Sequence, residues 1–228
     1  ITASTFTLES IKSNIKPNSK KIVIPYGPGF ISSNIQINSK TYNRNRPKLL
    51  FVGQGQHRKG LHHLLEVWCL KFYHFCELNL VLNNVDKCFY EKLNSLPGNL
   101  NIFVNLPNNA LSKLYSSNDI FVLPSLCEGF GFVYLEALFH GCLLVGTKNT
   151  CLPDLNLPKK VCQISQTSNL ISIAISIFSI LTNNTQFGTR FWYWIGDRYT
   201  LNPNYVAIEL QLCILFIWLI VIIEKKLI

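Results

Sequence analysis

The chain has 228 residues, of which 48% are hydrophobic and 14% charged, and its formal net charge is +9. This length permits one large domain or two small ones, and this composition excludes a disordered tail or a solvated linker. Its eight cysteines are too sparse for a disulfide scaffold, and none lies in a Cys-x-x-Cys pair. We interpret the seven from Cys69 to Cys162 as single small hydrophobic residues of a protein in a reducing compartment.

The positive charge is concentrated in the first third of the chain, in residues 16–21, 43–48 and 57–59. None of these groups is a run of five or more bases, and no alternation of basic and aromatic residues indicates a stacking groove. This distribution excludes nucleic acid as an expected partner and favours a phosphate-bearing small molecule or a membrane surface.

The chain contains no Met and begins at Ile1, without a charged-then-apolar leader. One interpretation is a processed or trimmed chain. The motifs farther along favour the other, a fragment that lacks its start.

The expected elements begin late in the chain. Residues 1–47 are polar, with one apolar run at 22–24 that ends in a Pro/Gly cluster typical of a turn or hinge. From Lys48 onward, short apolar runs alternate with helical periodicity. The pattern predicts strands at 49–52, 78–82, 102–104, 120–123 and 143–145, and helices at 61–72, 108–115 (capped by Asn108) and 131–140. Buried strands between amphipathic helices predict a Rossmann-like, doubly wound parallel α/β sheet.

Ligands of such sheets bind in the loops that lead from a strand into a helix, here 53–60, 105–109 and 125–131. The first loop places Lys59 at a helix start, where backbone N–H groups and the helix dipole favour an anion. It is neither a Walker A loop nor Gly-x-Gly-x-x-Gly, and a solvated basic turn is an equally open interpretation.

The segment 125–136 is more specific. Gly129 and Gly131 let the backbone approach a ligand closely, at the start of a helix. Glu136 lies about two turns beyond Glu128, inside an otherwise apolar helix, and needs a polar partner if it is buried. Sugar or ribose hydroxyls would serve, and an exposed helix face is the alternative.

The Glu-x7-Glu spacing of Glu128 and Glu136, preceded by Val-Leu-Pro-Ser and containing Glu-Gly-Phe-Gly, resembles the donor half of a retaining family 4 (group 1) glycosyltransferase. Further segments are similar to the same family, and the resemblance extends over residues 1–185. Residues 24–27 resemble the family's crossing between two Rossmann halves, residues 50–60 resemble its first donor-domain loop, and residues 111–125 resemble the segment that leads into its Glu-x7-Glu loop.

This resemblance implies a GT-B fold with a nucleotide sugar between two domains. It divides the chain into a remnant of the N-terminal acceptor domain with the crossing (1–47), a nucleotide-sugar-binding domain (48–185) and an atypical apolar tail (186–228). The implied reaction is transfer of a hexosyl group from a UDP- or GDP-sugar to an acceptor glycan or lipid-linked sugar, with retention of configuration. The missing acceptor domain would act in cis or in trans.

The resemblance also implies roles for single residues. Lys59 would hold the diphosphate and offset charge on the leaving group, and Glu128 would contact the transferred sugar; both are candidate catalytic residues. Glu136 would accept the ribose hydroxyls, and Leu106 lies in the turn that reads the base. The backbone N–H groups toward the donor would come from Gly129, Phe130, Gly131 and Phe132.

Two positions depart from the family pattern. Gln54 stands where many members carry an Arg: as a donor-binding residue it would donate hydrogen bonds but supply no charge, so donor affinity would lean on Lys59 or be reduced. Arg58 could substitute, although we expect its side chain to point elsewhere. Asn105 replaces a common Gly.

We predict no metal and no cofactor beyond the donor substrate, because the chain has no Asp-x-Asp and its histidines lack ligand spacing. The adjacent His62 and His63 should face different ways on a helix. The apolar run 212–223 falls short of the about 20 residues of a membrane span; interfacial or core packing and an out-of-frame sequence are the alternatives. We expect a cytoplasmic protein, with membrane-surface contact through this tail left open.

A rival function belongs to another class: a non-catalytic nucleotide-binding module or a decayed fragment without transferase activity. Gln54, the missing start and the unusual tail favour it. Detectable sugar transfer by the isolated chain would eliminate this rival.

Overall fold

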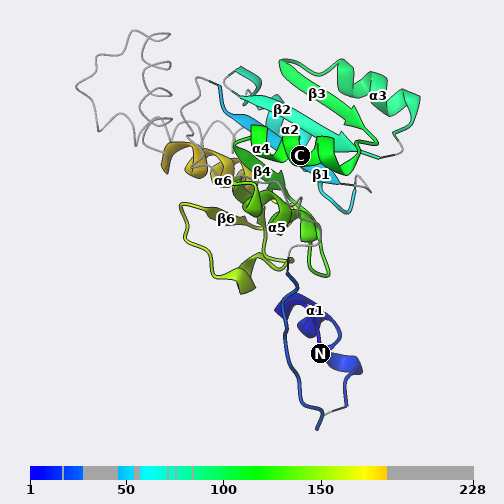
Figure 1. Cartoon of the computed structure of the whole chain (residues 1–228), viewed down its shortest axis with the longest axis vertical. Coiled ribbons are helices and arrows are strands. Elements are labelled where there is room, and N and C mark those ends of the chain that lie inside the picture. Colours follow the sequence, from blue (N-terminus) through cyan, green and yellow to red (C-terminus); the bar gives the residue numbers. More distant parts are fainter. Residues whose placement is uncertain are drawn as a thin grey trace, which may run out of the picture.

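The computed structural model describes residues 1–16, 18–27, 46–53, 57–70, 72–74, 76–83 and 85–183. These residues form a parallel sheet flanked by helices, and an N-terminal arm (residues 1–16 and 18–27) that projects from it (Figure 1). Gln54 and the predicted tail at 186–228 lie outside the described residues.

The sheet has six strands: β1 (Lys48–Gly53), β2 (Glu77–Leu82), β3 (Asn99–Val104), β4 (Ile120–Leu123), β5 (Leu143–Thr147) and β6 (Cys162–Ser165). Neighbouring strands are parallel throughout, in the order β3-β2-β1-β4-β5-β6. The chain changes direction across the sheet between β1 and β4. The helices that follow these two strands therefore lie on opposite faces of the sheet, and their loops start side by side at the carboxyl edge, where open α/β sheets bind ligands.

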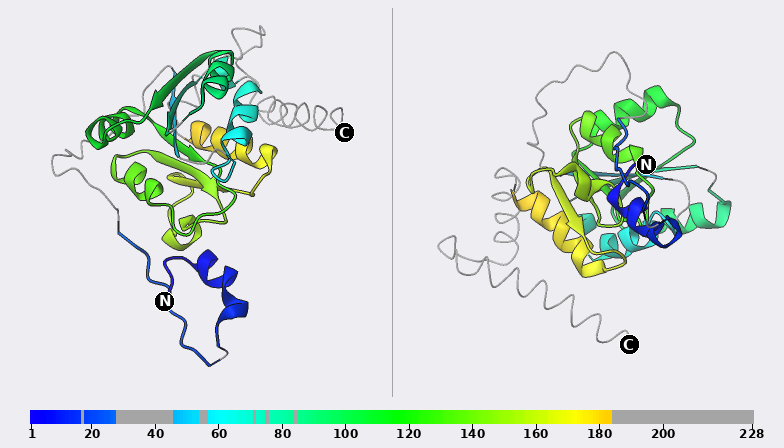
Figure 2. Two further views of the ribbon diagram at one scale, coloured as in Figure 1. Left: turned by 90° about the vertical axis from the view of Figure 1, so that its right-hand side faces the viewer. Right: turned by 90° about the horizontal axis from the view of Figure 1, so that it is seen from below.

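The helices are α1 (Thr5–Ser10), α2 (Leu61–Cys69), α3 (Lys87–Asn94), α4 (Asn108–Ser117), α5 (Phe132–Phe139) and α6 (Leu170–Asn183). Short 3-10 turns occupy Lys12–Asn14, Phe72–His74 and Leu152–Leu155. Helix α2 packs against α6 and α4 against α5, and the two pairs cover opposite faces of the sheet (Figure 2). Right-handed crossovers impose this arrangement once the strand order reverses. The predicted doubly wound α/β class is confirmed.

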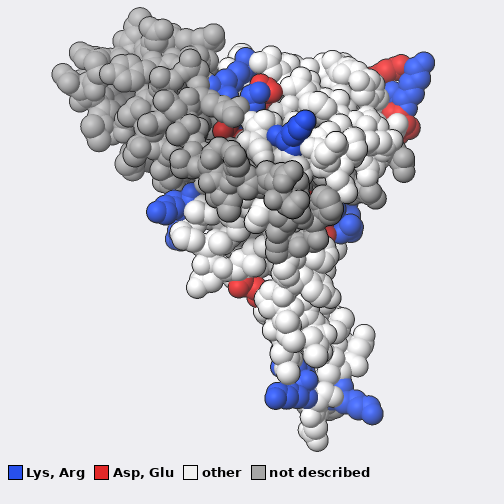
Figure 3. All heavy atoms as spheres, in the orientation of Figure 1, with Lys and Arg blue, Asp and Glu red and all other residues white. Residues whose placement is uncertain are grey.

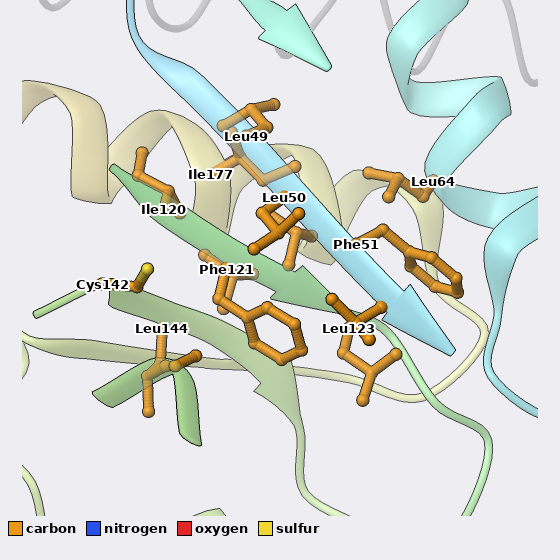
Figure 4. Close-up of a cluster of buried hydrophobic side chains, with 14 of the residues drawn as sticks. Leu49, Leu50, Phe51, Leu64, Ile120, Phe121, Leu123, Cys142, Leu144 and Ile177 are labelled. Atoms are coloured by element: carbon orange, nitrogen blue, oxygen red, sulfur yellow. The ribbon is translucent and has the colours of Figure 1, made fainter. Parts of the chain in front are cut away.

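The core is centred on β1, β4 and β5 (Figure 4). Leu50, Phe51, Phe121 and Leu144 are fully buried on these strands, and Ile177 of α6 packs beside them. Each such side chain contributes about 1.5–3 kcal/mol on burial, so this layer fixes the strand ends that carry the loops.

Several sequence predictions need correction. Helix α2 ends at Cys69, and Phe72 lies in a separate 3-10 turn. Asn108 is the first residue of α4 and not its cap: Pro107 holds that place, without a side-chain cap bond. Strand β3 starts earlier than predicted because polar residues alternate along this edge strand. The elements α1, α3, β6 and α6 were not predicted. Three of the seven cysteines interpreted as small hydrophobic residues are exposed: Cys69, Cys88 and Cys127.

The N-terminal arm folds back on itself through a parallel bridge between Thr2 and Val23. Ser4 caps α1 by accepting a hydrogen bond from the Thr7 N–H at 3.1 Å. Basic side chains gather at the far tip of the arm (Figure 3), whose sequence carries Lys12, Lys16, Lys20 and Lys21. Among the described residues, no helix combines the length and apolarity needed to cross a membrane.

Candidate active site

The loops that follow β1 and β4 are bonded together at the carboxyl edge of the sheet. The Leu126 N–H donates to the Arg58 carbonyl at 2.9 Å. Gly60 has a φ of 70° and lies so close to Pro124 that a Cβ would collide with the Pro124 carbonyl oxygen. Only glycine satisfies both demands, so Gly60 lets the first loop seat on the second.

Two cations from the first loop converge on one carboxylate of the second. Lys59 Nζ lies 2.7 Å from Glu128 Oε1, and Arg58 Nη1 lies 3.1 Å from Glu128 Oε2. Ser125 Oγ donates to the same Oε1 at 3.0 Å. The Lys59 and Glu128 side chains are only 11% and 7% exposed. The Lys59–Glu128 pair is therefore largely desolvated, whereas Arg58 is half-exposed, and two positive charges face one negative charge.

This arrangement brings together Lys59 and Glu128, which the sequence singled out separately. The expectation that Arg58 points elsewhere is wrong, since its guanidinium also donates to the Cys127 carbonyl at 3.2 Å. A tight turn, closed by the Gly60 N–H bond to the His57 carbonyl at 3.0 Å, directs both side chains to the second loop.

The glycine loop at 129–131 is shaped by a buried tyrosine that the sequence analysis did not single out. Gly131, with a φ of 89°, precedes α5, and a Cβ there would lie 2.8 Å from Tyr134 Cδ2. The Tyr134 hydroxyl donates to the Leu123 carbonyl at 2.7 Å. Burial, with the nearby Glu128 charge, raises the Tyr134 pKa well above its ordinary value, so the hydroxyl remains a donor. A tyrosine in an otherwise apolar helix was the available signal.

Glu136 is neither exposed nor fully buried on α5. Its Oε2 accepts a hydrogen bond from the Tyr115 hydroxyl at 3.1 Å, and Oε1 has no partner among the described residues. Burial raises the Glu136 pKa, an effect opposed by the Tyr115 bond and by His140. The alternative of an exposed helix face is therefore excluded.

The turn predicted to read a base follows β3, at the edge of the sheet. Asn105 has a φ of 53°, and its N–H donates to the Leu82 carbonyl at 3.0 Å. This left-handed backbone suits Gly or Asn, which explains how Asn stands where a Gly is common. Leu106 is half-buried and packs against the core. Two strand spacings, about 10 Å, separate this turn from β1.

The histidines at the start of α2 differ from expectation. The rings of His62 and His63 lie side by side, with centroids 3.9 Å apart, and do not face different ways. Burial and the neighbouring His62 lower the His63 pKa. Within the described residues, no three His, Cys, Asp or Glu side chains are grouped to hold a metal ion.

The sequence model of the glycosyl transferases group 1 matches residues 32–186. The chain therefore belongs to the group 1 glycosyltransferase family. A curated relative, described as an uncharacterized 41.2 kDa protein in the cps region of Klebsiella pneumoniae, is 26% identical over 118 residues. That match covers 52% of this chain and 32% of the relative, so the chain spans about a third of the relative's length.

Solved structures share the fold. WaaG, a glycosyltransferase involved in lipopolysaccharide biosynthesis, matches with a TM-score of 0.52 and 19% identity over 65% of this chain and 42% of its own. The C-terminal domain of the group 1 protein LpcC from Francisella tularensis matches with a TM-score of 0.52 and 21% identity, over 62% of this chain and 78% of its own. Sucrose-phosphate synthase from Thermosynechococcus elongatus matches with a TM-score of 0.64 and 18% identity, over 96% of this chain and 58% of its own. The chain thus has the Rossmann-like fold of GT-B glycosyltransferases.

Proposed function

We propose that this chain is the donor-binding half of a retaining glycosyltransferase that uses a UDP- or GDP-sugar. The observation that carries the proposal is the cluster of Arg58, Lys59 and Glu128, with its desolvated Lys59–Glu128 pair, where the β1 and β4 loops meet beside the start of α5. The acceptor, a glycan or lipid-linked sugar, would be held by a further domain in cis or in trans.

The cluster suits a diphosphate because its charges do not cancel. Arg58 and Lys59 supply two positive charges, and Glu128 neutralises one of them. A diphosphate would meet the remaining charge, together with the N-terminal end of α5, which favours anions. In this proposal the two cations offset the charge on the leaving nucleotide in place of a divalent metal, in a water-poor setting that strengthens the attraction.

Glu128 is left with limited capacity for a ligand. A carboxylate offers about four acceptor positions, and Lys59, Arg58 and Ser125 fill three of them. We therefore propose that Glu128 holds the two cations in place and accepts one hydroxyl of the transferred sugar.

The nucleoside would extend from the cluster toward the β3 edge. The open Oε1 of Glu136 would accept a ribose hydroxyl, and the turn containing Leu106 would meet the base. The spacing of about 10 Å between β3 and β1 leaves room for a ribose between base and diphosphate. Retention rests on the resemblance of the Glu128-to-Glu136 segment and is tested by the anomeric NMR signals of the product.

Calorimetric titration of the full chain with UDP, UMP, GDP and GMP tests donor binding. One diphosphate should bind more tightly than its monophosphate, with an affinity that falls as salt rises. Arg58→Gln should weaken diphosphate binding about tenfold, because it removes a charge-assisted contact from a half-exposed position. Lys87→Gln, which changes an exposed lysine on α3, is the matched control and should bind as the unaltered chain does.

Absence of diphosphate binding by the folded chain would refute this function. Equal weakening by Arg58→Gln and Lys87→Gln would refute the assignment of the phosphate site to the cluster.

A further inference from the structure

The arm and the glycine loop meet through one peptide group. Ser4 Oγ and Thr7 Oγ1 both donate to the Gly129 carbonyl oxygen, each at 2.7 Å. A carbonyl oxygen has two lone pairs, so it accommodates both hydroxyl protons. Ser4 is fully buried, and 125 positions of chain separate it from Gly129. The contact is therefore a specific tertiary one.

The orientation of this carbonyl sets the orientation of the next amide. In a planar trans peptide, the C=O of Gly129 and the N–H of Phe130 point in opposite directions. Since the carbonyl points at the arm, the Phe130 N–H is directed away from it, and it meets no acceptor among the described residues.

The sheet domain holds the neighbouring peptides but not this one. The Glu128 N–H donates to the Asn149 carbonyl at 2.9 Å, and the Phe130 carbonyl accepts from the Cys151 N–H at 3.3 Å. A Cβ on Gly129 would have no atom within 4 Å, so packing around Gly129 leaves its own backbone angles unrestrained, while the buried Phe130 ring anchors the residue that follows. Among the described residues, the hydrogen bonds that hold the Gly129 carbonyl come from the arm.

Aromatic contacts seat the arm on the same loop. The Tyr26 ring stacks on Phe132 with centroids 5.4 Å apart and meets the Phe130 ring edge-on at 5.3 Å. The Thr5 N–H donates to Asp154 Oδ2 at 2.8 Å, which fixes the start of α1.

From this geometry we infer that Ser4 and Thr7 are positioning residues, which hold the Phe130 N–H in the orientation needed to bind the donor diphosphate. The inference rests on the proposed function for its ligand. The orientation of the peptide is independent of it and is measured separately.

Two measurements on the Ser4→Ala/Thr7→Val double variant test the inference. Without nucleotide, the NMR order parameter of the Phe130 amide should fall from about 0.85 to below about 0.6, because the peptide is released. Affinity for the diphosphate should fall about tenfold, the effect of losing a hydrogen bond to a charged group, while affinity for the monophosphate stays constant.

Matched variants separate positioning from general damage. Ser10→Ala removes an exposed hydroxyl of α1 whose one hydrogen bond within the described part of the chain is to the Thr7 carbonyl, and should behave as the unaltered chain. Thr7→Ser keeps the hydroxyl donor, so the Phe130 order parameter and the diphosphate affinity should both match those of the unaltered chain.

An unchanged order parameter would overturn the inference, as would equal loss of mono- and diphosphate binding. If the unaltered chain binds neither nucleotide, the proposed function fails, and the order parameter alone decides whether the arm orients the loop.

Discussion

The ion pair between Lys59 and Glu128 should stabilise the chain as a coupled, buried unit. Their side chains are 11% and 7% exposed, so removal of one partner strands a charge in a desolvated place. Removal of one member of a buried pair costs about 3–5 kcal/mol. We expect Lys59→Met to lower the free energy of unfolding by about 3 kcal/mol, the low end of this range, since Arg58 and Ser125 still bond Glu128. Glu128→Gln should cause a similar loss.

In the double variant, the half-exposed Arg58 loses its charged partner but keeps its hydrogen bond to the Cys127 carbonyl. This variant should therefore lose about 3 kcal/mol and not the sum of about 6, which gives a coupling energy of about 2–3 kcal/mol. Urea unfolding of the four chains measures this coupling, and added salt should change it little, because buried pairs are weakly screened.

The exposed pair of Lys87 and Glu91 is the internal control. Its side chains are 91% and 66% exposed and its atoms lie 3.9 Å apart, so its coupling should stay below about 0.5 kcal/mol. A Lys59–Glu128 coupling as small as this control would refute the view that the candidate site is desolvated.

Two further predictions concern single substitutions. Gly60→Ala should lower the free energy of unfolding by about 3 kcal/mol, because Ala disfavours the left-handed backbone and its Cβ collides with Pro124. Gly129→Ala has open space around it and should change the free energy of unfolding by no more than about 1 kcal/mol. Urea unfolding compares the two variants, and equal losses would contradict the loop geometry. The raised Glu136 pKa favours the protonated carboxyl in the folded state, so stability is lost as pH rises from its ordinary value of 4.5 through the folded value. Glu136→Gln should abolish that loss of stability in unfolding curves measured from about pH 4 to about pH 8, and it should weaken nucleotide binding. A pH profile of stability equal to that of the unaltered chain would show that Glu136 is solvated.

Local sequence patterns predicted the central strands because those strands are buried on both faces. Residues 49–52 and 120–123 are continuous apolar runs, and no other element suits them. The pattern failed for α6, where Ile alternates with Ser or Ala at the period of a strand through residues 171–177. That segment is a helix because Ile173, Ile177 and Ile180, at helical spacing, are buried. Tertiary packing overrode local preference there.

The sequence by itself singled out the loop from Glu128 to Glu136 and the Lys59 turn as candidates, since glycine placement and the Glu-x7-Glu spacing are local features. Only the tertiary structure decided that these loops share one site. Their contact depends on β1 lying beside β4, although Arg58 and Cys127 are 69 positions apart. The directions of Arg58, Tyr134 and Ser4 were decided in the same way. A side chain's direction and partners depend on which distant strands and loops become neighbours, and no local spacing encodes that.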